Sequence, residues 1–90
     1  MEVLQTTSFR RNVKKLHANQ KKDLDAAIRK IIDAPDIGEA KVGDLDGVLV
    51  YKFQMVKQLT LLAYSFEKET IILTLLAIGS HENFYRDLKR

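Results

Sequence analysis

The chain has 90 residues, a net charge of +3 and no cysteine. This length allows one domain, because a second hydrophobic core needs a much longer chain, and the missing cysteines exclude disulfides and thiolate metal sites. The charged start and the short apolar run over residues 71–78 suit neither a signal peptide nor a membrane span, so we expect one cytoplasmic domain, residues 1–90, with no membrane contact, metal or cofactor.

The first third of the chain predicts a strand and two helices. Residues 2–6 (EVLQT) have the composition of a short strand. Apolar residues at i, i+4 and i+7 then indicate a helix, with Thr7 or Ser8 as its N-cap. A second amphipathic helix follows from an Asn19 cap and stops before Pro35. Together these segments predict a helical hairpin.

Positive charge is concentrated on these two helices. The first 22 residues hold six basic residues and one acidic residue, a net charge of +5. A focused positive surface attracts polyanions, although a solvated helix face or an acidic protein partner explains the same charges. The six basic residues are Arg10, Arg11, Lys14, Lys15, Lys21 and Lys22.

The second half of the chain has the period of strands. Residues 35–47 are rich in glycine and acidic side chains and are expected to form a loop. Beyond it, side chains alternate between two faces, which predicts an antiparallel three-stranded meander. The last strand is apolar on both faces, so we expect it to be the central one. The expected strands are residues 49–55, 59–66 and 70–78.

The chain ends with the pattern of a short helix. Ser80 can cap it, and His81 and Tyr85 then lie one turn apart on the same face. Phe84 and Leu88 share another face and can dock on the sheet. The sequence therefore predicts an α+β domain in which a strand and a two-helix hairpin pack on an antiparallel sheet, β-α-α-β-β-β, with a short C-terminal helix.

In this order of elements the chain resembles the RelE/ParE superfamily of toxins from type II toxin–antitoxin systems, and its RelE-like branch in particular. Three stretches carry the resemblance: KVGDLDG at residues 41–47, LLAY at 61–64 and GSHENFYRDLK at 79–89. The resemblance covers essentially the whole chain. It implies a cognate antitoxin that wraps the toxin in a hetero-oligomer. It also implies one of two targets: mRNA at the ribosome for RelE-like members, or DNA gyrase for ParE-like members.

RelE-like toxins cut RNA without metal. This reaction needs a group that deprotonates the ribose 2′-OH, cations that stabilise the pentavalent phosphorane, and a group that protonates the leaving 5′-oxygen. The resemblance carries proton transfer to His81 and Tyr85 in the C-terminal segment. It carries phosphate stabilisation to Lys52 and Lys57 of the sheet. We therefore expect a ribosome-dependent endoribonuclease.

Further RNA contacts are expected from Lys41 in the loop and Arg86 in the terminal helix, together with the six basic residues of the helices. Residues 38–78 contain no arginine, and lysine stabilises a phosphorane only as a point charge. This departure from the RelE pattern keeps a gyrase inhibitor, or a chain that only binds its antitoxin, as alternatives. Lys52 also suits an edge lysine that deters sheet association.

Overall fold

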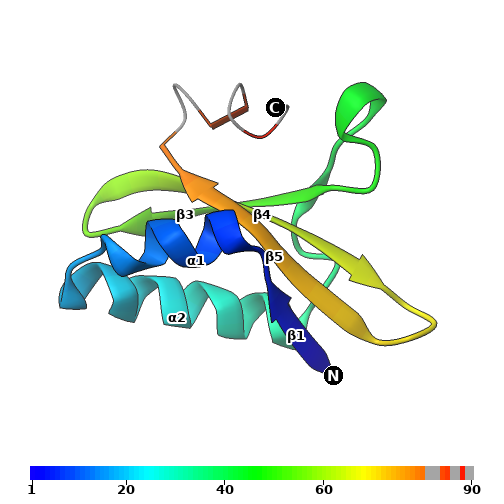
Figure 1. Ribbon diagram of the computed structural model, residues 1–90, viewed down its shortest axis with the longest axis horizontal. Coiled ribbons are helices and arrows are strands. Elements are labelled where there is room, and N and C mark those ends of the chain that lie inside the picture. The colour runs from blue at the N-terminus through cyan, green and yellow to red at the C-terminus, as the bar shows by residue number, and fades with distance from the viewer. Residues whose placement is uncertain (81–83, 86–87, 89–90) are drawn as a thin grey trace.

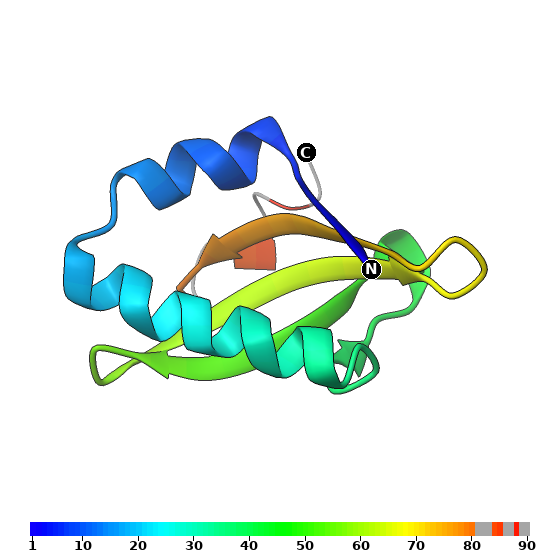
Figure 2. The same cartoon turned by 90° about the horizontal axis from the view of Figure 1, so that it is seen from below.

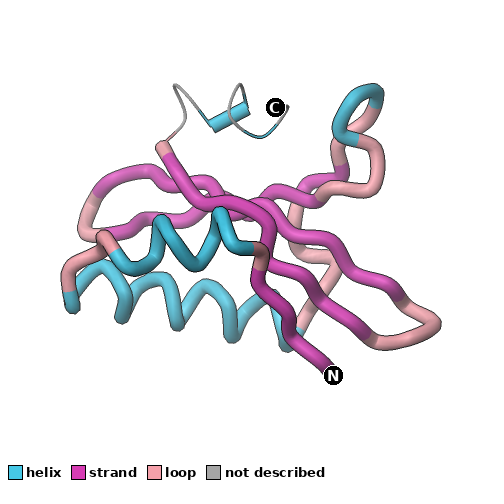
Figure 3. Tube along the Cα trace, in the orientation of Figure 1, coloured by secondary structure: helices cyan, strands magenta, loops and turns pink. Residues whose placement is uncertain are grey.

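In the computed structural model a five-stranded sheet carries two helices on one face (Figures 1 and 2). The structure describes residues 1–80, 84, 85 and 88. Connections between the strands of the meander are short (Figure 3). The elements are β1 (Glu2–Gln5), α1 (Thr7–Lys14), α2 (Ala18–Asp33), β2 (Glu39–Ala40), a short 3-10 helix (Gly43–Leu45), β3 (Leu49–Met55), β4 (Gln58–Glu67) and β5 (Ile72–Gly79).

The sheet has the strand order β1-β5-β4-β3-β2. The strands from β2 to β5 pair in antiparallel fashion, which confirms the predicted meander and the α+β class. β1 pairs with β5 in parallel, from Glu2 opposite Ile72 to Gln5 opposite Leu75. The expectation that residues 70–78 form the central strand is wrong by one position: β4 is the middle strand, because β1 adds on the far side of β5.

β4 is covered on both faces. Leu61, Leu62, Ala63 and Tyr64 follow one another along it, and each has a relative exposure of 0%. Leu62 and Tyr64 pack in a core with α1 and α2, whereas Leu61 and Ala63 pack in a second cluster with Phe84. The C-terminal segment therefore lies on the face of the sheet opposite the helices (Figure 1).

Thr6 joins the start of α1 to β5. Its hydroxyl accepts a hydrogen bond from Phe9 N at 3.1 Å and donates one to the carbonyl oxygen of Leu76 at 2.9 Å. The prediction that Thr7 or Ser8 caps this helix is therefore wrong by one or two residues. The reason is tertiary, because the capping hydroxyl is the one that also reaches β5, seventy residues away.

Two boundaries farther along the chain also differ from the prediction. α2 begins at Ala18 with His17 as its N-cap, rather than Asn19, and the backbone N–H of His17 donates to the Gln20 side chain at 2.8 Å. The stretch 35–47, expected to be only a loop, contains the two-residue strand β2. Among the described residues, no helix has the length and apolar character that a membrane span requires.

Tyr64 holds the segment between α2 and β2. Its buried hydroxyl donates a hydrogen bond to the Pro35 carbonyl at 2.7 Å and accepts one from Gly38 N at 2.9 Å. Burial raises the pKa of this phenol, so it stays neutral and can donate. A Cβ on Gly38 would lie 2.8 Å from the Tyr64 oxygen, so only glycine allows this approach. This contact fixes the position of Gly38, and therefore of β2 and Lys41, which directly follow it.

Tyr64→Phe should lower the free energy of unfolding by about 1–3 kcal/mol, because the change leaves a buried N–H and a carbonyl without a partner. Urea unfolding measures this. The matched control is Tyr51→Phe, since Tyr51 is half-buried and its hydroxyl has no hydrogen bond within the described residues. Equal stability of the two variants would show that the Tyr64 hydrogen bonds do not hold the segment.

Thr6→Val should cost about 1–2 kcal/mol of unfolding free energy, because valine keeps the side-chain shape but loses both hydrogen bonds. Thr6→Ser keeps the hydroxyl and should retain most of the stability. Urea unfolding of both variants checks the pair. If serine were as costly as valine, the methyl group rather than the hydroxyl would be the important part of Thr6.

Candidate functional site

The C-terminal segment covers the sheet face that the helices leave open. Residues 84, 85 and 88 have helical backbone, as expected for a short terminal helix. Phe84 is 4% exposed and packs in the cluster of Val50, Leu61 and Ala63. The rings of Phe84 and Tyr85 meet edge to face, with centroids 5.2 Å apart. Burial of Phe84 therefore fixes the place of Tyr85.

Lys41 lies beside Tyr85. Its ammonium is 5.2 Å from the centroid of the Tyr85 ring, within the range of a cation–π interaction. The same ammonium donates to Glu39 Oε1 at 2.9 Å. The backbone of Lys41 is fixed as well, because its N–H donates to the Val48 carbonyl at 2.9 Å where β2 pairs with β3. The segment after β2 and the C-terminal segment are far apart in the sequence, and they meet where Lys41 contacts Tyr85.

Three charged side chains, Glu39, Lys41 and Lys52, influence one another near Tyr85. The Lys41 ammonium, and then that of Lys52, lower the pKa of the Glu39 carboxyl. Glu39, and then Tyr85, raise the pKa of Lys41. Lys52 lies on the same face of β3 as Val50, so both ammonium groups and the Tyr85 ring are on the face away from the helices. Because Glu39 is exposed, its ion pair adds little to stability.

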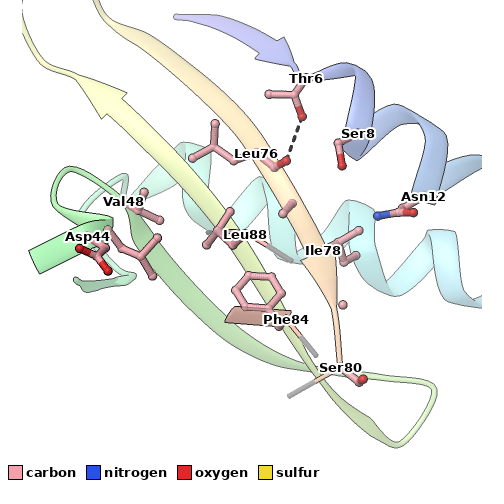
Figure 4. A pocket seen from close by; sticks show the side chains of 13 residues that line it. Thr6, Ser8, Asn12, Asp44, Val48, Leu76, Ile78, Ser80, Phe84 and Leu88 are labelled. Carbon is pink, nitrogen blue, oxygen red and sulfur yellow. Dashed lines mark hydrogen bonds between the residues drawn. The ribbon is translucent and has the colours of Figure 1, made fainter. Parts of the chain in front are cut away.

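Two hollows flank the C-terminal segment. The larger, about 640 Å³, runs from Thr6, Ser8 and Asn12 along the end of β5 to Phe84 and Leu88 (Figure 4). Asp44 is the one charged residue among the described residues that line it. The smaller, about 360 Å³, is lined by residues 39–42, 44, 45 and 85, and therefore contains the Glu39–Lys41 pair and Tyr85.

The smaller hollow is the candidate functional site. The Tyr85 phenol and the Lys41 ammonium line this hollow and can hydrogen-bond a phosphate, with Lys52 outside the lining but close enough to act on Glu39. The carboxylates of Glu39 and Asp44 also line the hollow, and a buried apolar cluster lies behind Tyr85. Glu39 competes with any anion for Lys41, so a bound phosphate would have to displace or share it. Within the described part of the chain, no three His, Asp or Glu side chains gather where a metal could bind.

The structure brings together three of the residues expected in the site: Tyr85, Lys41 and Lys52. Lys57 lies in the turn after β3, on the order of 10 Å beyond Lys52, because β3 continues for three residues past Lys52 before the chain reverses. The six basic residues of α1 and the start of α2 are exposed, and their helices cover the other face of the sheet. His81 and Arg86 lie outside the described residues.

Glu39 is the site residue that the sequence analysis missed. The signal was available, because Glu39, Ala40 and Lys41 alternate in charge as the residues of an edge strand often do. It was hidden because these residues fall in a stretch with the composition of a loop. Asp23, whose carboxylate accepts a hydrogen bond from Val56 N in the turn after β3, was missed for a different reason: its partner lies 33 residues away.

Known structures share this fold. The intact toxin–antitoxin complex RelBE of E. coli contains a chain with a TM-score of 0.72 and 16% identity, covering 90% of this chain and 96% of that one. A doubly substituted E. coli toxin RelE in the free state gives 0.74 and 14%, with 97% and 87% covered. A YoeB/ParE toxin from Agrobacterium tumefaciens gives 0.71 and 17%, with 90% and 99% covered.

At identities this low the solved structures show the fold alone. No curated protein sequence matches the chain. The family is shown by a different comparison, in which the model for the ParE-like toxin of type II bacterial toxin–antitoxin systems matches residues 3–89. The match includes β2, β3 and the C-terminal segment, which contain the residues of the candidate site. The chain belongs to the ParE-like toxin family of type II bacterial toxin–antitoxin systems.

Proposed function

We propose that this toxin is a ribosome-dependent endoribonuclease that cuts mRNA and so stops translation. The observation that carries the proposal is the Tyr85 phenol held beside the Lys41 ammonium, with Lys52 on the same face of the sheet. A proton-transfer group next to two cations, on a surface open to solvent, is what metal-free cleavage of RNA requires. In this proposal the substrate is mRNA bound to the ribosome, and the toxin acts in the cytoplasm.

The reaction divides among these side chains as follows. The ribose 2′-oxygen loses its proton and attacks the adjacent phosphorus, the bond from phosphorus to the 5′-oxygen breaks, and the 5′-oxygen takes up a proton. The products are a 2′,3′-cyclic phosphate and a 5′-hydroxyl. Lys41 and Lys52 balance the charge on the phosphorane, and the raised pKa of Lys41 keeps it cationic during the step. Tyr85 transfers one proton, and His81 is the candidate for the other.

Glu39 is a poor candidate for the base. Its pKa is lowered by the Lys41 and Lys52 ammonium groups, and a weak base removes a proton from a hydroxyl inefficiently. Its role in the proposal is to hold Lys41 in place until RNA arrives. Lys57 is left out of the reaction, since it lies far along the hairpin from Tyr85.

A cognate antitoxin is the second proposed partner. The family to which the chain belongs consists of toxins from type II toxin–antitoxin systems, and two of the similar structures contain the toxin RelE together with RelB or a RelB peptide. A hetero-oligomer that covers Tyr85 and Lys41 would neutralise the toxin. The larger hollow beside the C-terminal segment is available for part of such a contact.

A gyrase inhibitor is the second candidate function. The observation that favours it is the absence of arginine from residues 38–78, so that β2 to β5 supply no bidentate clamp for phosphate. Purified toxin that blocks supercoiling by gyrase while mRNA in a translation extract stays intact would establish this alternative. A chain that does neither but binds an antitoxin would be a toxin without activity on either target.

Tyr85→Phe and Lys52→Ala should each slow mRNA cleavage by roughly 30- to 1,000-fold, equivalent to about 2–4 kcal/mol of barrier. The measurement is primer extension on mRNA from a cell-free translation reaction with purified toxin. Lys68→Ala, in the loop after β4, makes the same change of charge away from the site and should cut at the native rate. A folded Tyr85→Phe variant with full activity would remove Tyr85 from the mechanism.

Glu39→Gln should improve the activity of the toxin, whereas the preceding variants of Tyr85 and Lys52 lower it. Removing the carboxylate frees Lys41 for phosphate, so we expect KM for ribosome-bound mRNA to fall by about twofold to fivefold with kcat nearly unchanged. The same cleavage assay, run over a range of ribosome concentrations, separates the two constants. A loss of kcat of about a hundredfold would instead identify Glu39 as the group that takes the proton.

A further inference from the structure

The LLAY stretch of β4 ends in a tyrosine that the proposed reaction does not use. The Tyr64 ring packs in the core with the helices, and its partner across the sheet is Leu49 of β3. Its hydroxyl holds both ends of the turn that follows α2, because it donates to the Pro35 carbonyl oxygen and accepts from Gly38 N. β2 begins at the next residue, at the edge of the sheet (Figure 2). One buried side chain therefore fixes where the chain enters the sheet.

β2 is too short to set its own position on β3. Two residue pairs join these strands, and one of them is Glu39 opposite Val50. The next backbone bond, from Lys41 N to the Val48 carbonyl oxygen at 2.9 Å, continues the same ladder. A strand displaced by one residue could form equivalent bonds, because each of these residues has an N–H and a carbonyl group. The ladder alone therefore does not select the register.

The register decides on which face of the sheet Lys41 lies. Side chains alternate along a strand, so a shift by one residue moves each of them to the other face. Glu39 shares the face of Val50, its partner, and Lys41 follows two residues later on the same face. In this register the Lys41 ammonium lies 5.2 Å from the centroid of the Tyr85 ring. After a shift of one residue, Lys41 would point toward the helices, with the sheet between it and Tyr85.

Gly38 can lie against the Tyr64 hydroxyl because it has no side chain. A Cβ at this position would lie 2.8 Å from the Tyr64 oxygen, 2.9 Å from Tyr64 Cε1 and 3.1 Å from Leu49 Cβ. Its neighbours Ile37 and Glu39 each have a Cβ, so neither could take its place after a shift of one residue. Glycine therefore selects which residue lies against Tyr64. The short fixed distance along the chain from Gly38 to Lys41 then selects the face on which the lysine lies.

We propose that the Tyr64–Gly38 contact sets the register of β2, and that Tyr64 is thereby a positioning residue for the Lys41 ammonium. The inference rests on the proposed function, in which Lys41 balances the charge of the phosphorane. Tyr64 is not among the described residues that line the hollow of the site, so it acts through the segment that carries Lys41. Because Tyr64 is 0% exposed, water does not compete for its two hydrogen bonds.

Tyr64→Phe removes the hydroxyl and keeps the ring, so it tests the contact directly. NMR of the chain with ¹³C-labelled lysine follows Lys41 without RNA, because a methylene group over an aromatic ring resonates upfield of one in solvent. Lys41→Arg assigns the signal. In Tyr64→Phe we expect the Lys41 signal to lose most of its upfield shift. It should stay in place in Tyr51→Phe, which loses a phenol hydroxyl elsewhere, and in Thr6→Val, which loses similar stability. A native Lys41 signal in Tyr64→Phe would overturn the proposal.

Gly38→Ala breaks the same contact from the other side. The added methyl group must displace either the Tyr64 hydroxyl or the strand, so the Lys41 signal should move as it does in Tyr64→Phe. Both substitutions together should move it little further than either alone, since each removes one shared contact. Independent, additive movements would show that the contact between these two residues does not set the register.

Cleavage of mRNA distinguishes positioning from a general loss of stability. Tyr64→Phe should lower kcat/KM roughly tenfold in the native chain and cause no further loss in Lys41→Ala, because it acts through that ammonium. Thr6→Val should cut at the native rate under conditions in which both variants are folded. Equal losses from Tyr64→Phe in the two backgrounds would show that Tyr64 does not act through Lys41.

These outcomes are separable from failure of the proposed nuclease. The NMR experiment uses neither RNA nor ribosomes, so a Lys41 signal that depends on Tyr64 in a chain that never cuts mRNA would keep the register assignment and refute the nuclease. A chain that cuts mRNA, and whose Lys41 signal and cleavage rate are both native in Tyr64→Phe, would keep the nuclease and refute the positioning role.

Discussion

The structure depends on one strand that has no exposed face. From Leu61 to Tyr64 the side chains of β4 alternate between two apolar clusters, and none of the four has measurable exposure. One face must therefore be covered by the amphipathic helices, and the other needs a second cover, which the C-terminal segment supplies through Phe84. A sheet of five strands with only one helical layer would leave that second cluster in water.

This arrangement separates two charged surfaces by the thickness of the sheet. The site around Tyr85 and Lys41 lies with the C-terminal segment, while the basic residues of α1 and the start of α2 face away on the helical layer. The two surfaces cannot contact the same phosphate.

Two acidic side chains form contacts of different kinds. Glu39 pairs directly with the Lys41 ammonium, whereas Asp23 accepts a hydrogen bond from the backbone N–H of Val56 in the turn after β3. The difference matters chemically. A direct carboxylate partner competes with phosphate for the ammonium, but a carboxylate engaged by a backbone N–H leaves the ammonium free to bind. This turn, in which Val56 and Lys57 have positive φ angles, is held by the Asp23 carboxylate of α2.

The sequence alone was sufficient for the kinds of elements and their order, because the periods of 3.6 and 2 are local properties of a chain. It was also sufficient to select Tyr85, Lys41 and Lys52 as site candidates by residue type and family resemblance. Only the tertiary structure decided what touches what: the parallel pairing of β1 with β5, the cap at Thr6, the meeting of Lys41 with Tyr85 and the bond from Asp23 to the turn. Each of these joins segments far apart in the chain, and their approach is set by how the two faces of β4 are covered rather than by any local pattern.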